Sequence, residues 1–492
     1  MDESESKIKV KPLRRNKDES KFNLYKAALE WSLIDPIVIE NEADLKSRKE
    51  WKDKVQPYEH QVKNLITFCR RLPVTLLADD VGLGKTISAG LVISELISRN
   101  RIEKILIVCP KLLIDQWAEE LDSKFGIKST KAVGRDLIQA EPPDAEGAVI
   151  TTYTSARMHL DKIVDKGYDM LVLDEAHKLR NLYGVDKTPQ VAKRFQQALA
   201  DRMFKYVLML TATPIQNRLW DIYSLVDLLS TARGHENPFG SEGLFYRKFI
   251  GDKREQSRVL KPQAKDEFRD IVYSYMSRIR RADANLQFPE RIIQRHIVDP
   301  TSEELELFEV VSKSIQDLNR LAQIGILKAL VSSPEALLSW LNSMVRNSTI
   351  DPTFRDSVAE IVKRTPTTAK LNGLGVLVKK LKSEKPEDWR MVIFTCSRET
   401  QTTIQTFLEK QGISCGLING DTSSRNTEMI QVFKNDPPKI HVIISTEAGS
   451  EGVNLQASNV LVNYDLPWNP MIVEENWSCT TVSLKTRECF DF

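Results

Sequence analysis

A glycine-rich loop is the first feature of the chain whose residues could do chemistry. The segment 79–86, DDVGLGKT, follows an apolar run and precedes a stretch with helical spacing. Glycines let backbone N–H groups close on phosphate oxygens, and the start of a helix adds a positive dipole. Lys85 is expected to reach the β- and γ-phosphates of ATP, and the Thr86 hydroxyl to bind Mg²⁺. The predicted ATP-binding residues of the loop are Gly82, Leu83, Gly84, Lys85 and Thr86.

An acidic motif, DEAH at 174–177, supplies the complementary chemistry. It ends an apolar run, and a carboxylate at the end of a parallel strand lies where Mg²⁺ and the γ-phosphate meet. We expect Asp174 to bind Mg²⁺, directly or through water, and Glu175 to polarise the attacking water. His177 is expected to couple the site to the rest of its domain. Lys85, Asp174 and Glu175 are the predicted catalytic residues, and ATP and Mg²⁺ are the predicted cofactors.

The elements that must position these loops are short apolar runs separated by segments with helical spacing. The runs do not alternate with polar residues, which is typical of strands buried on both faces of a parallel sheet. Strands that alternate with helices indicate βα units. The runs lie at 74–78, 104–110, 147–153, 169–174, 206–211, 391–395, 414–420, 441–446 and 459–465.

The middle of the chain lacks such runs. From about 215 to 365 it is charged and helical in period. We therefore predict an α/β fold with two parallel-sheet domains and a helical insertion between them. The predicted parts are a charged extension at 1–50, a first ATP-binding lobe at 51–235, a helical insertion and connector at 236–368, an incomplete second lobe at 369–475 and an aberrant tail at 476–492.

Composition narrows the class of partner and the location. The net charge is +2, so a surface for DNA has to be local. The six cysteines form no CxxC pair, which favours reduced thiols. No apolar stretch approaches the roughly 20 residues needed to cross a bilayer, and segment 1–20 lacks the apolar core of a secretory signal. We expect a cytoplasmic protein with no membrane partner.

Several further segments resemble the motifs of superfamily 2 helicases, and more narrowly the Swi/Snf-type DNA-translocating ATPases. Within these, the bacterial subgroup that includes the polymerase-recycling ATPase is the most similar, and the resemblance spans Val55 to Met471. That family tolerates the aspartate at position 79, where the general phosphate loop has glycine. The segments are PYEHQ (57–61), CPKLLIDQWAEEL (109–121), ITTYTSAR (150–157), LTATPIQN (210–217), SRIRRADANLQFPER (277–291) and STEAGSEGVNLQASNVLVNYDLPWNP (445–470).

The resemblance implies two RecA-like lobes and roles for single residues. Gln61 would recognise adenine, and Thr211 and Thr213 would join His177 in linking the ATP state to DNA. Gly452 and Asn454 would form a tight turn that approaches the nucleotide. The implied nucleic-acid contacts are Lys111, Gln116, Trp117, Thr152, Tyr153, Ser445 and Thr446. The implied partners are double-stranded DNA and a protein cargo such as a DNA-bound complex, and the implied location is a prokaryotic nucleoid.

The chain departs from the family after Pro470. The last family motif places arginines against the γ-phosphate, whereas Asn476, Cys479 and Val482 stand at those positions and Arg487 lies too far along. Codons for residues 476–481, shifted by one base, can read Ile-Gly-Arg-Val-Gln-Arg, which fits that motif. We hypothesise a frameshift near codon 475, and a naturally divergent end is the alternative.

Two functions therefore stay open for this polypeptide. One is a DNA-stimulated ATPase and translocase whose turnover is impaired by the missing arginines. The other is a nucleotide-gated DNA-binding protein with little turnover. An RNA helicase of the DEAH type is disfavoured, because Trp117, the helical insertion and the WNP segment at 468–470 do not belong to its pattern.

Overall fold

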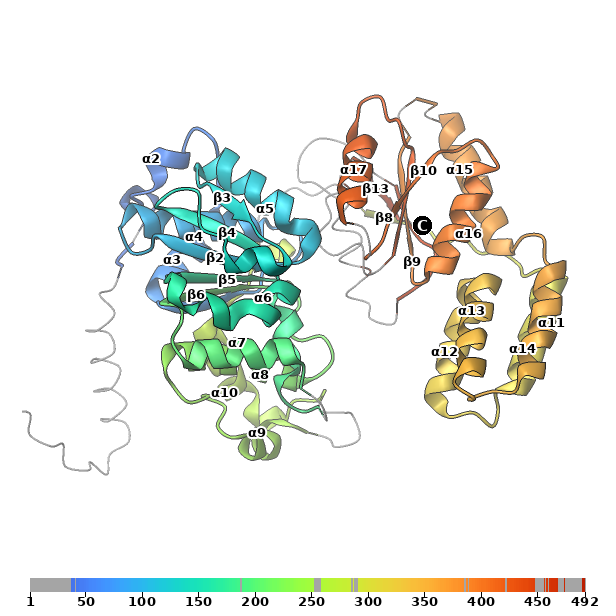
Figure 1. Cartoon of the computed structure of the whole chain (residues 1–492), viewed down its shortest axis with the longest axis horizontal. Helices are drawn as coiled ribbons and strands as arrows, with labels where there is room; N and C mark the ends of the chain where they lie inside the picture. Colours follow the sequence, from blue (N-terminus) through green and yellow to red (C-terminus); the bar gives the residue numbers. More distant parts are fainter. Residues whose placement is uncertain are drawn as a thin grey trace, which may run out of the picture.

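The computed structural model contains two α/β lobes and a cluster of helices (Figure 1). It confirms the predicted fold class. The structure describes residues 37–39, 41–185, 188–251, 258–284, 286, 291–384, 386–387, 389–420, 423–446, 455, 457–458, 460–467, 473 and 489–491.

The first lobe is built on a parallel sheet with strand order β3-β4-β2-β5-β6-β1-β7. Each apolar run predicted in this half forms one of its strands. The sheet adds β3 and β7, which are short edge strands that the sequence did not predict. The strands are β1 (Val74–Leu77), β2 (Lys104–Cys109), β3 (Ser129–Lys131), β4 (Gly147–Thr152), β5 (Met170–Asp174), β6 (Tyr206–Leu210) and β7 (Met276–Ser277).

Two apolar cores cover the two faces of this sheet. Along β2, Leu106 and Val108 enter one core, while Ile105 and Ile107 enter the other. Both faces are therefore dry, which explains why the strands carry continuous apolar runs. One face is covered by α3 (Glu59–Arg70), α4 (Lys85–Ser98) and α5 (Ile114–Glu120), and the other by α6 (Tyr153–His159), α7 (Gln190–Ala200), α8 (Leu219–Arg233), α9 (Glu242–Phe249) and α10 (Lys265–Tyr275).

The first lobe extends further along the chain than residue 235. Phe239, Phe245, Phe249 and Phe268 pack on one another in its core, and β7 pairs in parallel with β1. The helices of 242–275 thus belong to this lobe, although their sequence reads as helical insertion. An amphipathic helix shows which of its faces is buried, but not the core that it joins.

The second lobe is a smaller parallel sheet with strand order β10-β11-β9-β12-β13-β8. Helices α15 (Ala369–Glu384) and α16 (Arg398–Glu409) pack on one face, and α17 (Ser423–Lys434) contributes to the core on the other. Leu112 of the first lobe also contacts that second core. The strands are β8 (Arg291–Ile293), β9 (Met391–Thr395), β10 (Cys415–Ile418), β11 (Val442–Thr446), β12 (Val460–Asn463) and β13 (Cys489–Asp491).

Strand β13 lies in segment 476–492, which was predicted only as an aberrant tail. Its residues, Cys489–Asp491, pair in parallel with β12 and with β8. A three-residue strand is too short to produce a readable period. The positions where the family resemblance predicts arginines, Asn476, Cys479 and Val482, lie outside the described residues, and so does Arg487.

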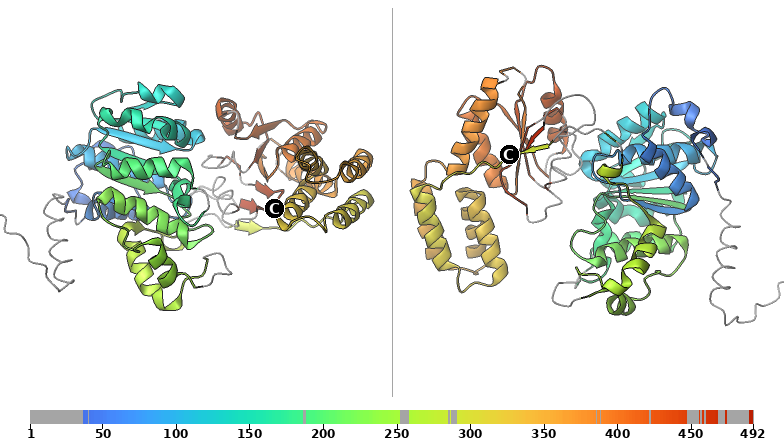
Figure 2. Two further views of the ribbon diagram at one scale, coloured as in Figure 1. Left: turned by 60° about the horizontal axis from the view of Figure 1, so that its bottom comes forward. Right: turned by 180° about the vertical axis from the view of Figure 1, so that it is seen from behind.

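The helical insertion is a separate cluster that follows β8. Its four helices share a core that includes Leu307, Ile326, Leu337, Leu341 and Val358. Figures 1 and 2 show the cluster beside the second lobe and away from the first sheet. The helices are α11 (Ser302–Ser314), α12 (Arg320–Ser332), α13 (Pro334–Arg346) and α14 (Pro352–Arg364).

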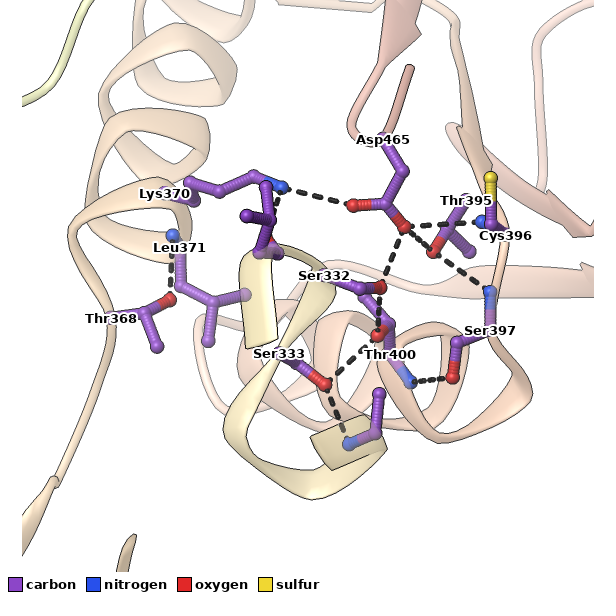
Figure 3. Close-up of polar contacts among 12 residues, drawn as sticks. Ser332, Ser333, Thr368, Lys370, Leu371, Thr395, Cys396, Ser397, Thr400 and Asp465 are labelled. Carbon is purple, nitrogen blue, oxygen red and sulfur yellow. Dashed lines mark hydrogen bonds and ion pairs between the residues drawn. The ribbon is translucent and has the colours of Figure 1, made fainter. Parts of the chain in front are cut away.

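A buried carboxylate joins this helical cluster to the second lobe (Figure 3). Asp465 follows β12 and accepts hydrogen bonds from the hydroxyls of Ser332 at 2.7 Å and Thr395 at 2.6 Å. It also accepts from the Cys396 N–H at 3.1 Å and pairs with the Lys370 ammonium at 3.0 Å. One carboxylate thus satisfies donors from the end of α12, from α15 and from the end of β9.

Asp465→Ala is expected to destabilise the second lobe by about 2–4 kcal/mol, because it leaves these donors without their acceptor. Urea denaturation followed by tryptophan fluorescence measures the change. Asp436→Ala is the matched control, since the Asp436 side chain is 87% exposed and lies 3.7 Å from Arg390. Equal stability of the two variants would contradict this role of Asp465.

Among the described residues, no helix is both long and apolar enough to cross a membrane.

Candidate ATP-binding and catalytic site

The phosphate loop connects β1 to α4 with the geometry that its glycines predict. Gly82 and Gly84 have φ angles of +84° and +71°, a region that side chains rarely adopt. A Cβ on Gly84 would lie 2.5 Å from the Gln61 amide nitrogen, so this position also lacks space. Lys85 opens α4, and its ammonium donates to the Asp79 carbonyl at 3.1 Å. The loop therefore holds its lysine at the start of the helix.

Gln61 and His60 brace this loop from α3. The Gln61 amide nitrogen donates to the Leu83 carbonyl at 3.1 Å, and its oxygen accepts from the Tyr58 N–H at 3.0 Å. The His60 Nε2 atom lies 2.9 Å from the same Leu83 carbonyl. Both side chains are buried. The adenine contact of Gln61 stays a prediction, and the observed contact adds a role in holding the loop.

Asp79 stands where the general phosphate loop has glycine, and its carboxylate has hydrogen-bond partners in the structure. Its carboxylate accepts from the Asn64 amide at 2.5 Å and from the Ile279 N–H at 2.8 Å. Burial raises the pKa of Asp79, and these two hydrogen bonds oppose the rise. Ile279 lies in the connector that leaves the first lobe, and Arg281 of the same segment donates to the Val81 carbonyl at 2.9 Å. The phosphate loop is thus attached to the chain that leads to the second lobe.

The acidic pair lies at the carboxyl end of β5. Asp174 is the last residue of the strand, and Glu175 has a left-handed backbone with φ of +54°. This conformation is costly for a residue other than glycine and is often found at functional sites. Strands β1 and β5 are parallel and flank β6, so the phosphate loop after β1 and the acidic pair after β5 lie at the same edge of the sheet. The structure therefore places Lys85, Asp174 and Glu175, the three predicted catalytic residues, at one edge.

The two carboxyl groups have opposite pKa shifts. Burial, and next the charge of Glu175, raise the pKa of Asp174. Burial also opposes ionisation of Glu175, but the hydrogen bond and charge of His177 outweigh it, so the pKa of Glu175 is lowered. A cation bound beside Asp174 would offset its desolvation. The arrangement keeps Glu175 ionised, as a base requires.

His177 connects this pair to the loop after β6. Its Nδ1 atom lies 3.0 Å from a Glu175 carboxylate oxygen and 3.3 Å from the Thr211 hydroxyl. The Thr211 hydroxyl accepts from the Thr213 N–H at 3.2 Å, and the Thr213 hydroxyl accepts from the Gln216 amide at 2.9 Å. The three residues predicted to couple the site, His177, Thr211 and Thr213, thus form one chain of contacts.

The residues present fit a Mg²⁺ ion. Each Asp174 oxygen accepts one hydrogen bond, from the Glu175 N–H at 2.9 Å and from the Trp117 indole at 2.8 Å. A carboxylate offers about four lone-pair sites, so acceptor capacity is left for a cation. Protein sites for Mg²⁺ usually supply one or two oxygen ligands and leave the rest to water and phosphate. Asp174 and Thr86 are the residues that would hold the ion.

Two predicted DNA contacts need correction. Trp117 is 1% exposed, and its indole N–H donates to Asp174. Tyr153 is also buried, and its hydroxyl donates to the Asp174 carbonyl at 2.8 Å. Large aromatic side chains beside apolar strands are drawn into the core, where their polar atoms need partners. The structure therefore assigns Trp117 and Tyr153 to the acidic site and not to an exposed DNA surface.

The other predicted DNA contacts differ in exposure. Thr152, Ser445 and Thr446 have buried side chains, and the Thr152 hydroxyl caps α6 by accepting from the Ser155 N–H. Their hydroxyls lie inside the lobes, and the DNA contact of these three residues stays a prediction. Lys111 is exposed and Gln116 is half-buried, so the DNA contact stays a prediction for both. Gly452 and Asn454, predicted to approach the nucleotide, lie outside the described residues.

Sequence reasoning missed the roles of Asn64 and Trp117. The aspartate at position 79 was a usable signal for Asn64, because a buried carboxylate in a phosphate loop requires donors. No comparable signal identifies Trp117, since its partner lies 57 residues away.

A phosphate loop that faces an acidic pair at the carboxyl edge of a parallel sheet, accompanied by a second parallel-sheet lobe, defines a helicase-like ATPase core. The family described as SNF2-related domain matches residues 43–346, and the family described as helicase conserved C-terminal domain matches residues 371–477. The chain therefore belongs to the SNF2 family of helicase-like ATPases.

Relatives of this chain include two bacterial proteins. An uncharacterized ATP-dependent helicase of Bacillus subtilis, YqhH, is 33% identical over 410 residues, which cover 81% of this chain and 68% of that protein. The RNA polymerase-associated protein RapA of Vibrio vulnificus is 26% identical over 435 residues, covering 82% of this chain. The chain spans less than half of RapA, since the match covers 44% of it.

Among solved structures, one match is the SWI2/SNF2 ATPase core of Sulfolobus solfataricus in complex with dsDNA. It has a TM-score of 0.40 and 22% identity, and the match covers 89% of this chain and 87% of the other.

Proposed function

We propose that this chain is a double-stranded DNA translocase, in which ATP hydrolysis between the two lobes drives movement along DNA. The observation that carries the proposal is the line of contacts from Asp174 through Glu175 and His177 to Thr211, at the edge of the sheet that also carries the phosphate loop. Such a line can transmit the state of the γ-phosphate to the loop after β6. Family membership and the relative named as an ATP-dependent helicase support it.

Each residue of the site has a defined task in this mechanism. The backbone N–H groups of the loop and the Lys85 ammonium bind the β- and γ-phosphates. Thr86 and Asp174 would hold Mg²⁺, which would supply positive charge to the phosphate oxygens. The ionised Glu175 orients water and accepts its proton. His177 hydrogen-bonds the Glu175 carboxylate and thereby fixes its direction.

The proposed partners are duplex DNA and a DNA-bound protein complex that the moving chain displaces. Lys111, in the turn before α5, and Gln116, in the first turn of α5, are the described residues proposed to face the DNA backbone. The RapA relative is named for association with RNA polymerase, which motivates a protein cargo here. The proposed location is the cytoplasm, at the nucleoid of a prokaryote.

A nucleotide-gated DNA-binding protein with little turnover is the second candidate. The observation that favours it is the residue set Asn476, Cys479 and Val482, where the family has arginines. An arginine at the γ-phosphate contributes about 10³–10⁵ in rate. We propose that hydrolysis by this chain is slow for that reason.

Glu175→Gln is expected to leave Mg·ATP affinity within about threefold and to lower single-turnover hydrolysis by about 10²–10⁴, because an amide cannot accept a proton from water. Equilibrium binding of a fluorescent ATP analogue and rapid-quench hydrolysis measure the two quantities. Glu141→Gln is the control, since Glu141 pairs with Lys104 at the amino end of β2, and the site lies at the carboxyl ends of the strands. Unchanged hydrolysis in Glu175→Gln would show that the base is another residue.

A further inference from the structure

Two aromatic side chains reach Asp174 from opposite faces of the first sheet. Trp117 lies in the core on the side of α3 and α4, and Tyr153 lies in the core on the side of α7 and α8. The Trp117 indole donates to the Asp174 carboxylate at 2.8 Å. The Tyr153 hydroxyl donates to the Asp174 backbone carbonyl, also at 2.8 Å. Side chain and main chain of one residue are therefore held by two separate helices.

These contacts leave the Asp174 carboxylate a single orientation. The indole binds one carboxylate oxygen, and the Glu175 N–H binds the other at 2.9 Å. An indole can only donate, so it favours an ionised acceptor. Hydrogen bonds to a charged acceptor are about twice as strong as those between neutral groups. The Trp117 ring is itself fully buried, so the position of its N–H is fixed by packing.

We propose that Trp117 and Tyr153 are positioning residues for the Mg²⁺ ligand, and that they set the affinity of the ATP site for the metal. Groups that hydrogen-bond a metal ligand orient it and tune its basicity, and their loss typically weakens metal binding about 10–100-fold. Neither side chain touches the nucleotide in this proposal. This inference rests on the proposed ATPase function, and it adds the residues that orient Asp174 for binding the ion.

Trp117→Phe tests the proposal because it keeps an aromatic ring and removes the N–H. Binding of a non-hydrolysable fluorescent ATP analogue is measured in EDTA and across a Mg²⁺ titration. We expect the affinity in EDTA to stay within about twofold, and the Mg²⁺ concentration for half-maximal tightening to rise about tenfold. Tyr153→Phe should shift the same midpoint by about two- to fivefold, since it acts through the main chain.

Trp51→Phe is the matched control. Trp51 is also 1% exposed, and its indole donates to the Ser47 hydroxyl at 2.9 Å, away from the acidic pair. We expect this variant to lose folding stability, as Trp117→Phe does, without a shift of the Mg²⁺ midpoint. A second readout is the electron paramagnetic resonance spectrum of bound Mn²⁺, which should change in Trp117→Phe and not in Trp51→Phe.

An unchanged Mg²⁺ midpoint in Trp117→Phe would overturn the proposal. An equal loss of nucleotide affinity in EDTA and in Mg²⁺ would also overturn it, because that result indicates damage to the whole phosphate loop. If Trp117→Phe unfolds at the assay temperature, Tyr153→Phe decides in its place. Failure of the unaltered chain to bind nucleotide in a Mg²⁺-dependent manner would instead remove the proposed ATPase function, and this inference with it.

Discussion

Lys85→Ala is expected to abolish measurable ATP binding. The Lys85 ammonium already lies at the loop, where it donates to the carbonyls of Asp79 and Asp80. Loss of one partner of a buried charged contact costs about 2–5 kcal/mol. A loss of about 4 kcal/mol corresponds to a roughly thousandfold higher Kd. Isothermal titration calorimetry with Mg·ATP measures this change directly.

Lys104→Ala is the matched control for this prediction. Lys104 opens β2 at the opposite edge of the same sheet, and its ammonium also donates to a backbone carbonyl, that of Lys166, at 3.2 Å. The control should bind ATP as the unaltered chain does. An unchanged Kd in Lys85→Ala would mean that the loop at 79–86 is not the phosphate site.

The second large effect concerns the positions where the family resemblance predicts arginines. Replacement of residues 477–482 by Ile-Gly-Arg-Val-Gln-Arg, which puts arginines at positions 479 and 482, is expected to raise the rate of ATP hydrolysis by about 10³ or more. The added arginines would supply positive charge to the γ-phosphoryl oxygens as negative charge spreads over them. Steady-state phosphate release at saturating ATP and duplex DNA measures the gain.

The control for this replacement is the same segment with alanine at both arginine positions, Ile-Gly-Ala-Val-Gln-Ala. It separates the effect of charge from the effect of a changed backbone. Brisk hydrolysis by the unaltered chain, or equal rates for the arginine and alanine versions, would contradict the proposed role of these positions.

Much of the fold could be predicted because its central strands are buried on both faces. The runs at 104–110 and 206–211 are continuous and apolar, and each became a strand between neighbours. The short strands β3 and β7 left no such signal, because two or three residues show no period. The first lobe was also predicted to end too early. Helical spacing at 242–275 could not reveal that Phe245 and Phe268 join the core of the first sheet.

For the candidate site, too, some residue roles could be predicted from the sequence and others could not. Lys85, Asp174 and Glu175 could be predicted because their chemistry depends on spacing within short motifs. The role of Asp79 depends on Ile279, which lies 200 residues later, and the role of Trp117 depends on the end of β5. Such contacts depend on how distant segments pack. The sequence therefore showed that Trp117 lies in a motif expected to contact DNA, but not that its side chain points to Asp174.

The most direct test of the account is phosphate release from Mg·ATP by the unaltered chain, measured with and without linear duplex DNA. We expect a slow rate that rises with duplex concentration, that does not depend on base sequence, and that is lost in Glu175→Gln. A rate that does not change at any duplex concentration, or that survives in Glu175→Gln, would contradict the claim that this site is a DNA-stimulated ATPase.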